Sequence, residues 1–222
     1  MISVEKIDVY GWEAAIRGMR NPLNSWSKSD SKFHCDNYDS CNKSCEHFDT
    51  GCNPIGAIYI GENDLDLMKR LSKGGTEHRK YLRMITVTMD ITAPLYWWKE
   101  FDTYKVGTVA NSCSTMHKIH AKEFEVGDFS TDHLEGFSWN RLDGLLTHLN
   151  NCREKFIETK DKVWWWQMIQ MLPSSYNQKR TVQFNYETVF NMIKQREHHK
   201  LDEWLMFTDV LKDLPYVKEL ME

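Results

Sequence analysis

The sequence NYETVFNMIKQR, residues 185–196, is preceded by Leu172-Pro173 and followed by His198-His199-Lys200. Its apolar residues Val189, Phe190 and Ile193 recur at the three- and four-residue steps that are typical of one face of a helix. The pattern therefore predicts an amphipathic helix near the C-terminus.

Two polar residues stand at the ends of this expected helix. Asn185 occupies the position of an N-cap, directly before the first periodic residue. At about 100° and 1.5 Å per residue, Asn185 and Arg196 point almost the same way and lie roughly 16 Å apart along the axis. A groove on that face could present an amide at one end and a fixed cation at the other. The alternative is an ordinary helix with a capping Asn and a solvated Arg.

The composition is that of a globular protein with a sizeable core: 222 residues, of which 41% are hydrophobic and 27% charged. A net charge of -4 argues against binding to duplex nucleic acid, which usually requires a basic stripe. No apolar run approaches the roughly 20 residues that span a membrane, and the N-terminal MISVEK lacks a signal-peptide core. We therefore expect a cytoplasmic protein with reduced thiols.

The order of segments predicts one α/β domain covering residues 1–222, without an internal repeat or a clear linker. Strands are expected at Ser3–Tyr10 and Tyr81–Ile91. Helices are expected at 11–20, from Asn63 as a cap to Gly74-Gly75, at 94–101, from Ser138 as a cap to Ile157, at Lys162–Met171 and at about 200–211.

Residues 23–54 are predicted to form a long loop rich in Ser, Asp, Asn and Cys. The loop contains Cys35, Cys41, Cys45 and Cys52, with His34 and His47 among them. Thiolates and imidazoles suit a structural zinc ion, but the gaps of five, three and six residues differ from the paired spacing of zinc knuckles. An ordinary polar loop is therefore favoured over a zinc site, and disulfides are disfavoured, so we assign no metal ligand.

No glycine-rich phosphate loop, Gly-x-Ser-x-Gly elbow, Walker-type Lys or His-Glu-x-x-His pattern is present. The richest polar constellation follows the second strand and its helix. It consists of Glu100, Tyr104, Lys105, Asn111, Ser112, Ser114, His117 and Lys118. Hydroxyls, an amide and two cations suit an anionic ligand, and a solvated connection is the alternative.

Four places in this order resemble the flavin-dependent thymidylate synthases, the ThyX family, which methylates dUMP with FAD and a folate. They are the helix Ala14–Arg20, the strand Ile85–Ile91 with Ala93-Pro94 and an aromatic helix, the segment Asn111–His117 in the place of Asn-Glu-x-Ser-x-Arg-Tyr, and Leu172-Pro173 with Asn185, Asn191 and Arg196. The last is the specific match, because the spacing of these residues is that of the family. His199 and Glu203-Trp204 stand near the family's closing His and Gln-Trp-Glu element.

The chain also departs from the family, whose signature begins with Arg-His-Arg. Residues 103–106 stand in that place, and only Lys105 keeps a cation, without the bidentate fork of Arg. Glu100 replaces a Gln, Ser112 a Glu, Met116 an Arg, and Ile169 an Arg. Charge-assisted hydrogen bonds contribute roughly 1.5–3 kcal/mol each. The affinity for dUMP and for the FAD pyrophosphate would therefore fall by orders of magnitude unless other cations replace the missing arginines. The available substitutes are Arg17, Arg20, Lys118, Arg180 and Arg196.

The resemblance implies a twisted, mainly antiparallel sheet packed with helices, and a homotetramer with shared active sites. The tryptophan-rich helices at Tyr96–Trp98 and Val163–Trp166 would suit that assembly. The implied function is FAD- and folate-dependent methylation of dUMP or a related pyrimidine nucleotide, with a reduced folate and NADPH as co-substrates. Partners other than the nucleotide, such as duplex nucleic acid or a membrane, are not expected.

The resemblance also implies roles for individual residues. Arg196 and Glu100 would act at the pyrimidine as the catalytic pair, while Asn185 and Asn191 would hold the flavin, with Tyr104 and Lys105 standing in for lost donors. Asn111, Ser114, Arg20 and Arg196 would bind the nucleotide. One alternative is a non-catalytic relative that binds a nucleotide or a partner protein, and another is an interaction module built on a zinc loop at 34–52.

Overall fold

The computed structural model describes residues 2–33 and 58–222. In these ranges the helices are α1 (Trp12–Arg20), α2 (Glu62–Lys73), α3 (Leu95–Phe101), α4 (Phe137–Thr159), α5 (Lys162–Met171), α6 (Tyr186–Arg196), α7 (Asp202–Lys212) and α8 (Val217–Met221). The strands are β1 (Ser3–Tyr10), β2 (Thr86–Pro94), β3 (Val109–Ser112) and β4 (Asn177–Asn185). Short 3-10 helices occur at η1 (Asn21–Leu23), η2 (Trp26–Lys28), η4 (Lys80–Arg83) and η5 (Val126–Asp128). Among the described helices, none is both long and apolar enough to cross a membrane.

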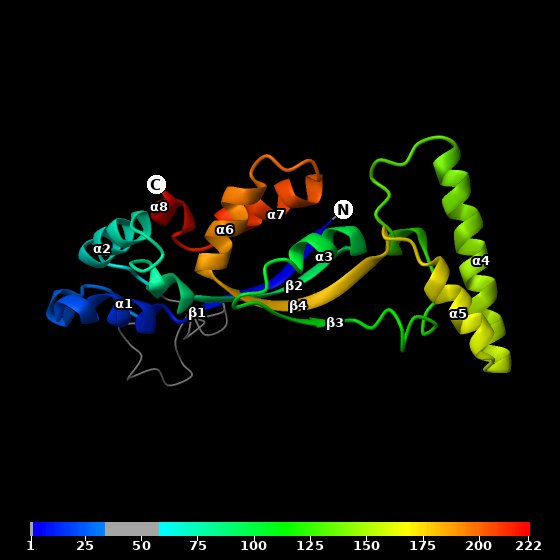
Figure 1. Cartoon of the computed structure of the whole chain (residues 1–222), viewed down its shortest axis with the longest axis horizontal. Helices are drawn as coiled ribbons and strands as arrows, with labels where there is room; N and C mark the ends of the chain where they lie inside the picture. The colour runs from blue at the N-terminus through cyan, green and yellow to red at the C-terminus, as the bar shows by residue number, and fades with distance from the viewer. Residues whose placement is uncertain (1, 34–57) are drawn as a thin grey trace, which may run out of the picture.

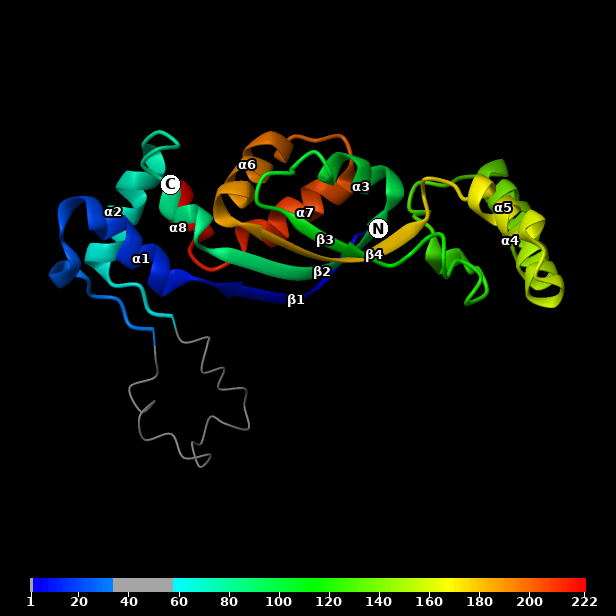
Figure 2. The same ribbon diagram turned by 60° about the horizontal axis from the view of Figure 1, so that its bottom comes forward.

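The four strands form one antiparallel sheet in the order β1-β2-β4-β3. Strands β2 and β4 are paired along their whole length, from Thr86 opposite Asn185 to Pro94 opposite Asn177. Helices α3, α6 and α7 lie over one face of this sheet (Figure 1, Figure 2). The architecture confirms the predicted α/β fold with an antiparallel sheet.

Alternation along β2 and β4 explains why the helices cover only one face. Val87, Met89 and Ile91 are buried, as are Val182 and Phe184 of β4. The residues between them on β2 are only half-buried. Because successive side chains of a strand point to opposite faces, one face of the sheet carries the apolar residues that the helices cover.

The main core contains a cluster of aromatic rings between α3 and α7. The ring centroid of Trp97 lies 4.8 Å from that of Trp204, 5.2 Å from that of Phe101 and 5.2 Å from that of Phe207. Trp97 and its neighbour Trp98 are fully buried within the chain. This burial corrects the expectation that they contribute to a subunit interface, because the chain's own core already covers them.

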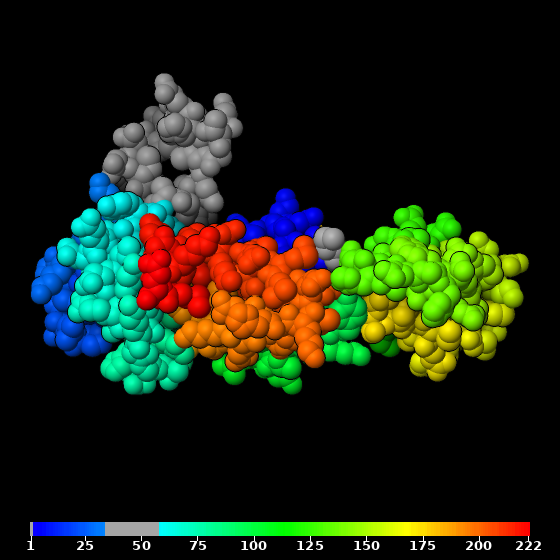
Figure 3. All heavy atoms as spheres, turned by 90° about the horizontal axis from the view of Figure 1, so that it is seen from above, coloured from blue at the N-terminus to red at the C-terminus, as the bar shows by residue number. Residues whose placement is uncertain are grey.

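A second apolar cluster lies between α4 and α5. Leu149, Cys152 and Met168 are buried there, together with Leu142 and Leu146. Figure 3 shows these two helices forming one end of an elongated molecule. On α5, Trp166 is 48% exposed, so it remains available to a partner.

Helices α1 and α2 lie at the opposite end of the molecule (Figure 1), and a buried ion pair joins them. The Nε of Arg20 donates to Oδ1 of Asp64 at 2.6 Å, and both side chains are nearly inaccessible. Oδ2 of Asp64 accepts from the hydroxyls of Ser29 and Ser31 and from the amides of Asp30 and Ser31. Burial by itself raises the pKa of Asp64, but the hydrogen bonds from Ser31, Ser29 and Arg20 outweigh it and hold the pKa below its usual value.

Several local expectations differ from the structure. The strand expected from Tyr81 begins only at Thr86, because Tyr81 and Leu82 belong to η4 and are both buried. Asn63 is not the cap of α2, which follows Gly61; instead, the Asp30 carboxylate accepts from the amides of Asn63 and Asp64. Helix α4 follows Gly136, and no side chain caps it, so Ser138 is not its cap either.

Three elements were not expected at all: β3, β4 and α8. The four residues of β3 are exposed, so they show no alternation of burial. Residues 34–54 of the segment predicted as a long loop, which include its four cysteines, lie outside the described residues, and the zinc question lies there too. Within the described residues, no group of three or more His, Cys, Asp or Glu is placed to hold a metal ion.

Candidate functional site

A cluster of polar and aromatic side chains forms where the ends of α3 and α6 meet the start of α7. The carboxylate of Glu100, in the last turn of α3, is its centre. Oε2 of Glu100 accepts from Nη1 of Arg196 at 2.6 Å and from Nε1 of Trp204 at 3.0 Å. Nε2 of His199 lies 3.1 Å from the same oxygen. The fold thus brings together residues that are about 100 positions apart in the sequence.

The Arg196 guanidinium is held on three sides. Its Nε donates to the hydroxyl of Tyr104 at 3.0 Å, and its Cζ lies 4.5 Å from the ring centroid of Trp204. The Tyr104 hydroxyl in turn donates to Oε1 of Gln195 at 3.0 Å. Only 16% of the Arg196 side chain is exposed, so the alternative of a solvated Arg is wrong. A cation that is fixed in this way is pre-organised to bind a ligand.

The hydrogen bonds of His199 determine which of its nitrogens carries a proton when the ring is neutral. Nδ1 accepts from the backbone N–H of Leu201 at 3.1 Å. The proton of the neutral ring is therefore on Nε2, which lies 3.1 Å from Oε2 of Glu100. Two donors, from Arg196 and Trp204, thus converge on Oε2 of Glu100, and the His199 ring lies beside them.

The remaining polar atoms of this pair face outward. Neither Oε1 of Glu100 nor Nη2 of Arg196 has a hydrogen-bond partner among residues 2–33 and 58–222, and neither is a buried atom. The pair therefore keeps one accessible acceptor and one accessible donor. This arrangement can bind a ligand that offers one donor next to one acceptor.

The other end of α6 carries Asn185, as the sequence predicts. Its Oδ1 accepts from the backbone N–H of Thr188 at 3.0 Å, which confirms the N-cap. The loop before β3 lies against this cap: Gly107 has a φ of +73°, and a Cβ there would stand 2.5 Å from Nδ2 of Asn185. Glycine therefore suits this position, because its φ is positive and a side chain would collide with Asn185. The Nδ2 of Asn185 remains a hydrogen-bond donor without a partner in the described chain.

The other predicted site residues make no side-chain hydrogen bond to this cluster within the described chain. Asn191 is half-buried on α6, and Lys105 is exposed in the loop after α3. Asn111 is exposed on β3, opposite Thr181 of β4. The hydroxyl of Ser114 accepts from the amides of Met116 and His117, which stabilises the turn after β3.

Arg20 lies at the α1–α2 end, whereas α3 and α7 lie over the middle of the sheet (Figure 1). Within one chain, the structure thus unites Glu100, Tyr104 and Arg196 but does not bring Arg20 to them. Among the proposed substitutes for the missing arginines, Arg180 is engaged with Asp102 at 2.8 Å and stacks on Trp98 at 4.2 Å.

Sequence reasoning assigned no role to three members of the cluster. His199 was marked only by its place near the family-like closing element. Trp204 supplies both a donor to Glu100 and a ring surface for Arg196, and its only signal was its place near the family-like closing element. Gln195 accepts from Tyr104, and nothing in the pattern of α6 marks it out from other exposed helix residues.

Comparison with known structures defines the class of fold. The chain is similar to the structure of thymidylate synthase X (ThyX) from Helicobacter pylori with FAD and dUMP, at a TM-score of 0.63 and 16% identity over 96% of this chain and 92% of that one. A flavin-dependent thymidylate synthase ThyX from Helicobacter pylori complexed with FAD and dUMP gives 0.62 and 17% identity over 95% and 92%. The fold is therefore a divergent ThyX-like fold, as the sequence resemblance implied. No family model matches the chain, and no curated protein does so.

Proposed function

We propose that the chain is a divergent flavin-dependent thymidylate synthase-like protein that binds FAD and a pyrimidine nucleotide. The substrate is dUMP or a related nucleotide, methylated with a carbon from a reduced folate and with NADPH as reductant. The observation that carries the proposal is the arginine fixed between Glu100, Tyr104 and Trp204, at the end of a helix that begins with a capping Asn. We further propose a cytoplasmic homotetramer.

The residues at the start of α6 fit the polar edge of a flavin. The Nδ2 of Asn185 has no hydrogen-bond partner within the described chain, and the loop at Gly107 packs against it. Asn191, half-buried on the same helix, would add a second amide, and Tyr104 would add a hydroxyl. Lys105 is the cation in the adjoining loop that would approach the flavin phosphates. When bound, reduced flavin supplies the hydride for such a methylation.

The Glu100–Arg196 pair fits the edge of a pyrimidine. A uracil ring presents a carbonyl oxygen next to an N–H, which matches a guanidinium donor beside a carboxylate acceptor. Asn111 and Ser114 would line the nucleotide site from the β3 side. Arg20 would reach this nucleotide only from another subunit of the proposed tetramer. These residues would position the pyrimidine ring and complement its charge. Both effects lower the barrier of the reaction.

A second candidate is a non-catalytic ThyX-like homologue that binds a nucleotide or a partner protein. It is favoured by the ion pair itself, because Glu100 neutralises Arg196 before any ligand arrives. It is also favoured by the single cation, Lys105, in the place of the family's Arg-His-Arg. Under this alternative the protein binds a nucleotide or a protein without turnover.

Titration with FAD, followed by visible absorbance, tests the first proposal. We expect saturable binding and a shift of the flavin bands. The Asn185→Asp variant keeps a cap oxygen but loses the Nδ2 donor, so it should bind FAD about tenfold more weakly, as expected for one lost hydrogen bond. Asn140→Asp, the same change at an exposed site on α4, is the control and should bind as the wild type does. A folded wild-type protein that fails to bind FAD at high micromolar concentration would rule the flavin out and leave the second candidate.

A further inference from the structure

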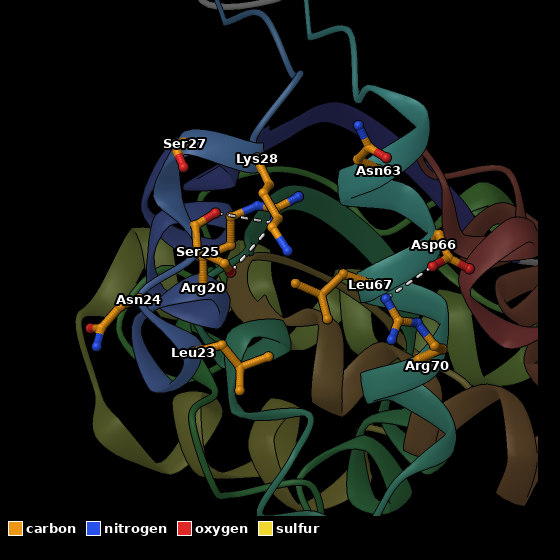
Figure 4. A pocket seen from close by; sticks show the side chains of 10 residues that line it. All are labelled: Arg20, Leu23, Asn24, Ser25, Ser27, Lys28, Asn63, Asp66, Leu67 and Arg70. Atoms are coloured by element: carbon orange, nitrogen blue, oxygen red, sulfur yellow. Dashed lines mark hydrogen bonds and ion pairs between the residues drawn. The ribbon is translucent and has the colours of Figure 1, made fainter.

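A cavity of about 590 Å³ lies between the C-terminal end of α1, the η1–η2 segment and α2, away from the Glu100 cluster. Figure 4 shows its side chains. From the α1 side they are Arg20, Leu23, Asn24, Ser25, Ser27 and Lys28, and from α2 they are Asn63, Asp66, Leu67 and Arg70. Its volume is within the range of small-molecule sites, roughly 300–1,000 Å³.

The lining is cationic and rich in hydrogen-bonding groups. Arg20, Lys28 and Arg70 line it, whereas Asp66 is its one carboxylate. Asp66 is already engaged with Arg70 at 3.0 Å in an exposed pair on the same helix. Asp64 likewise balances Arg20 at 2.6 Å, so the excess positive charge that an entering anion would meet is that of Lys28.

Arg20 provides an independent indication that an acceptor is missing. The residue is 3% exposed, and its Nη2 is a buried donor without a hydrogen-bond partner in the described structure. Its Nε is engaged with Asp64, and its Nη1 is 3.3 Å from the carbonyl oxygen of Ser25. Leaving a buried donor unsatisfied costs about 1–3 kcal/mol, so such a group usually has a reason to persist.

The surroundings of Asp64 hold this guanidinium in place. Oδ2 of Asp64 is saturated by the Ser29–Ser31 segment, while Oδ1 receives only the Nε of Arg20 among the hydrogen bonds of the described chain. Nη1 is turned toward Ser25, which also lines the cavity. The cation is fixed before a ligand binds, which lowers the entropic cost of binding.

We propose that this cavity binds a phosphate monoester of small-molecule size. The guanidinium of Arg20 and the ammonium of Lys28 would bind the phosphate oxygens, and the hydroxyls of Ser25 and Ser27 would donate to them. Arg and Lys form short, charge-assisted hydrogen bonds with phosphate. Leu23 and Leu67, which share the lining, would pack against the carbon part of the ligand.

The test is a two-dimensional amide NMR titration of the ¹⁵N-labelled protein with inorganic phosphate, without flavin or pyrimidine nucleotide. We expect saturable shifts confined to Asn24–Lys28 and the first turns of α2. Lys28→Ala should weaken phosphate binding about tenfold, because one charge-assisted hydrogen bond is lost. Lys73→Ala removes the same charge from α2 outside the cavity and should leave the affinity unchanged.

Arg20 variants risk unfolding, so Arg70→Ala serves as the second probe, with a weaker effect than Lys28→Ala because Arg70 is already paired. Equal loss of affinity in Lys28→Ala and Lys73→Ala would indicate nonspecific charge attraction and overturn the proposal. Absence of saturation at millimolar phosphate would also overturn it. Both outcomes are independent of FAD binding, so they leave the proposed flavin site and the Glu100–Arg196 pair untouched.

Discussion

Asp64→Asn is expected to lower the free energy of unfolding by about 3–5 kcal/mol, because it leaves the Arg20 cation buried without its counter-charge. Both side chains are nearly inaccessible, at 4% and 0% exposure, so water cannot replace the lost partner. Asp64→Asn also replaces one of the two carboxylate oxygens by an NH₂ donor. That group would face either Arg20 or the hydroxyls of Ser29 and Ser31, which already donate to Asp64. Urea denaturation followed by circular dichroism measures the effect.

Asp66→Asn is the matched control for this prediction. Asp66 lies on the same helix and pairs with Arg70, but both side chains are about two-thirds exposed. Exposed pairs contribute little, so the control should change the stability by less than about 1 kcal/mol. If the two variants lost the same stability, the buried pair would not be what holds α1 to α2.

The Asp64 carboxylate also predicts a dependence of stability on pH. Its pKa is lowered in the folded state, so its contribution is fully present above the unfolded pKa of about 3.9. The contribution is lost as the pH falls through the depressed folded pKa. The difference in stability between the wild type and Asp64→Asn should therefore shrink in acid, below about pH 4.

Trp97→Ala is expected to destabilise the protein by about 3–5 kcal/mol, the usual range for truncating a fully buried aromatic residue. Trp97 is 0% exposed and contacts the rings of Trp98, Phe101, Trp204 and Phe207. Its removal leaves a cavity directly beneath the residues that position Glu100 and Arg196. Thermal and urea denaturation should both report the loss.

Trp166→Ala, in the half-exposed aromatic run of α5, is the control for Trp97→Ala. It removes the same side chain, yet 48% of Trp166 already contacts solvent, so the loss should be well below that of Trp97→Ala. A loss of similar size at both positions would contradict the assignment of Trp97 to the centre of the main core. A change in oligomeric state of Trp166→Ala would point to an interface at α5.

The sequence was most informative where a local pattern determines the structure. Helix α6 begins after Asn185 because the Asn side chain caps it, and both the cap and the apolar spacing are visible in the sequence. β2 was found from its alternation, but its start was misplaced. The regular alternation begins only at Ile85, because Arg83 falls in the apolar register and Leu82 in the polar one. The chain before it turns in a 3-10 helix that buries two successive residues.

Long-range features were much harder to predict. β3 is exposed along its length and exists because β4 pairs with it, which no local pattern reveals. The pairing of Glu100 with Arg196 joins positions 96 apart, and only the resemblance to a known family suggested that both serve one site. Likewise, tryptophans are common both in cores and at subunit interfaces, so the sequence could not show which of the two contains Trp97 and Trp98. The fold shows that they lie in the core.

The central claim is that a flavin and a pyrimidine nucleotide share the site beside Arg196. The most direct measurement adds dUMP to the FAD-loaded protein and records the difference spectrum of the flavin. We predict a saturable perturbation in the wild type, at least about tenfold weaker dUMP binding in Arg196→Gln, and no change in the exposed control Lys200→Ala. A protein that binds FAD but shows no dUMP-dependent perturbation, or an Arg196→Gln variant that responds as the wild type does, would contradict the claim.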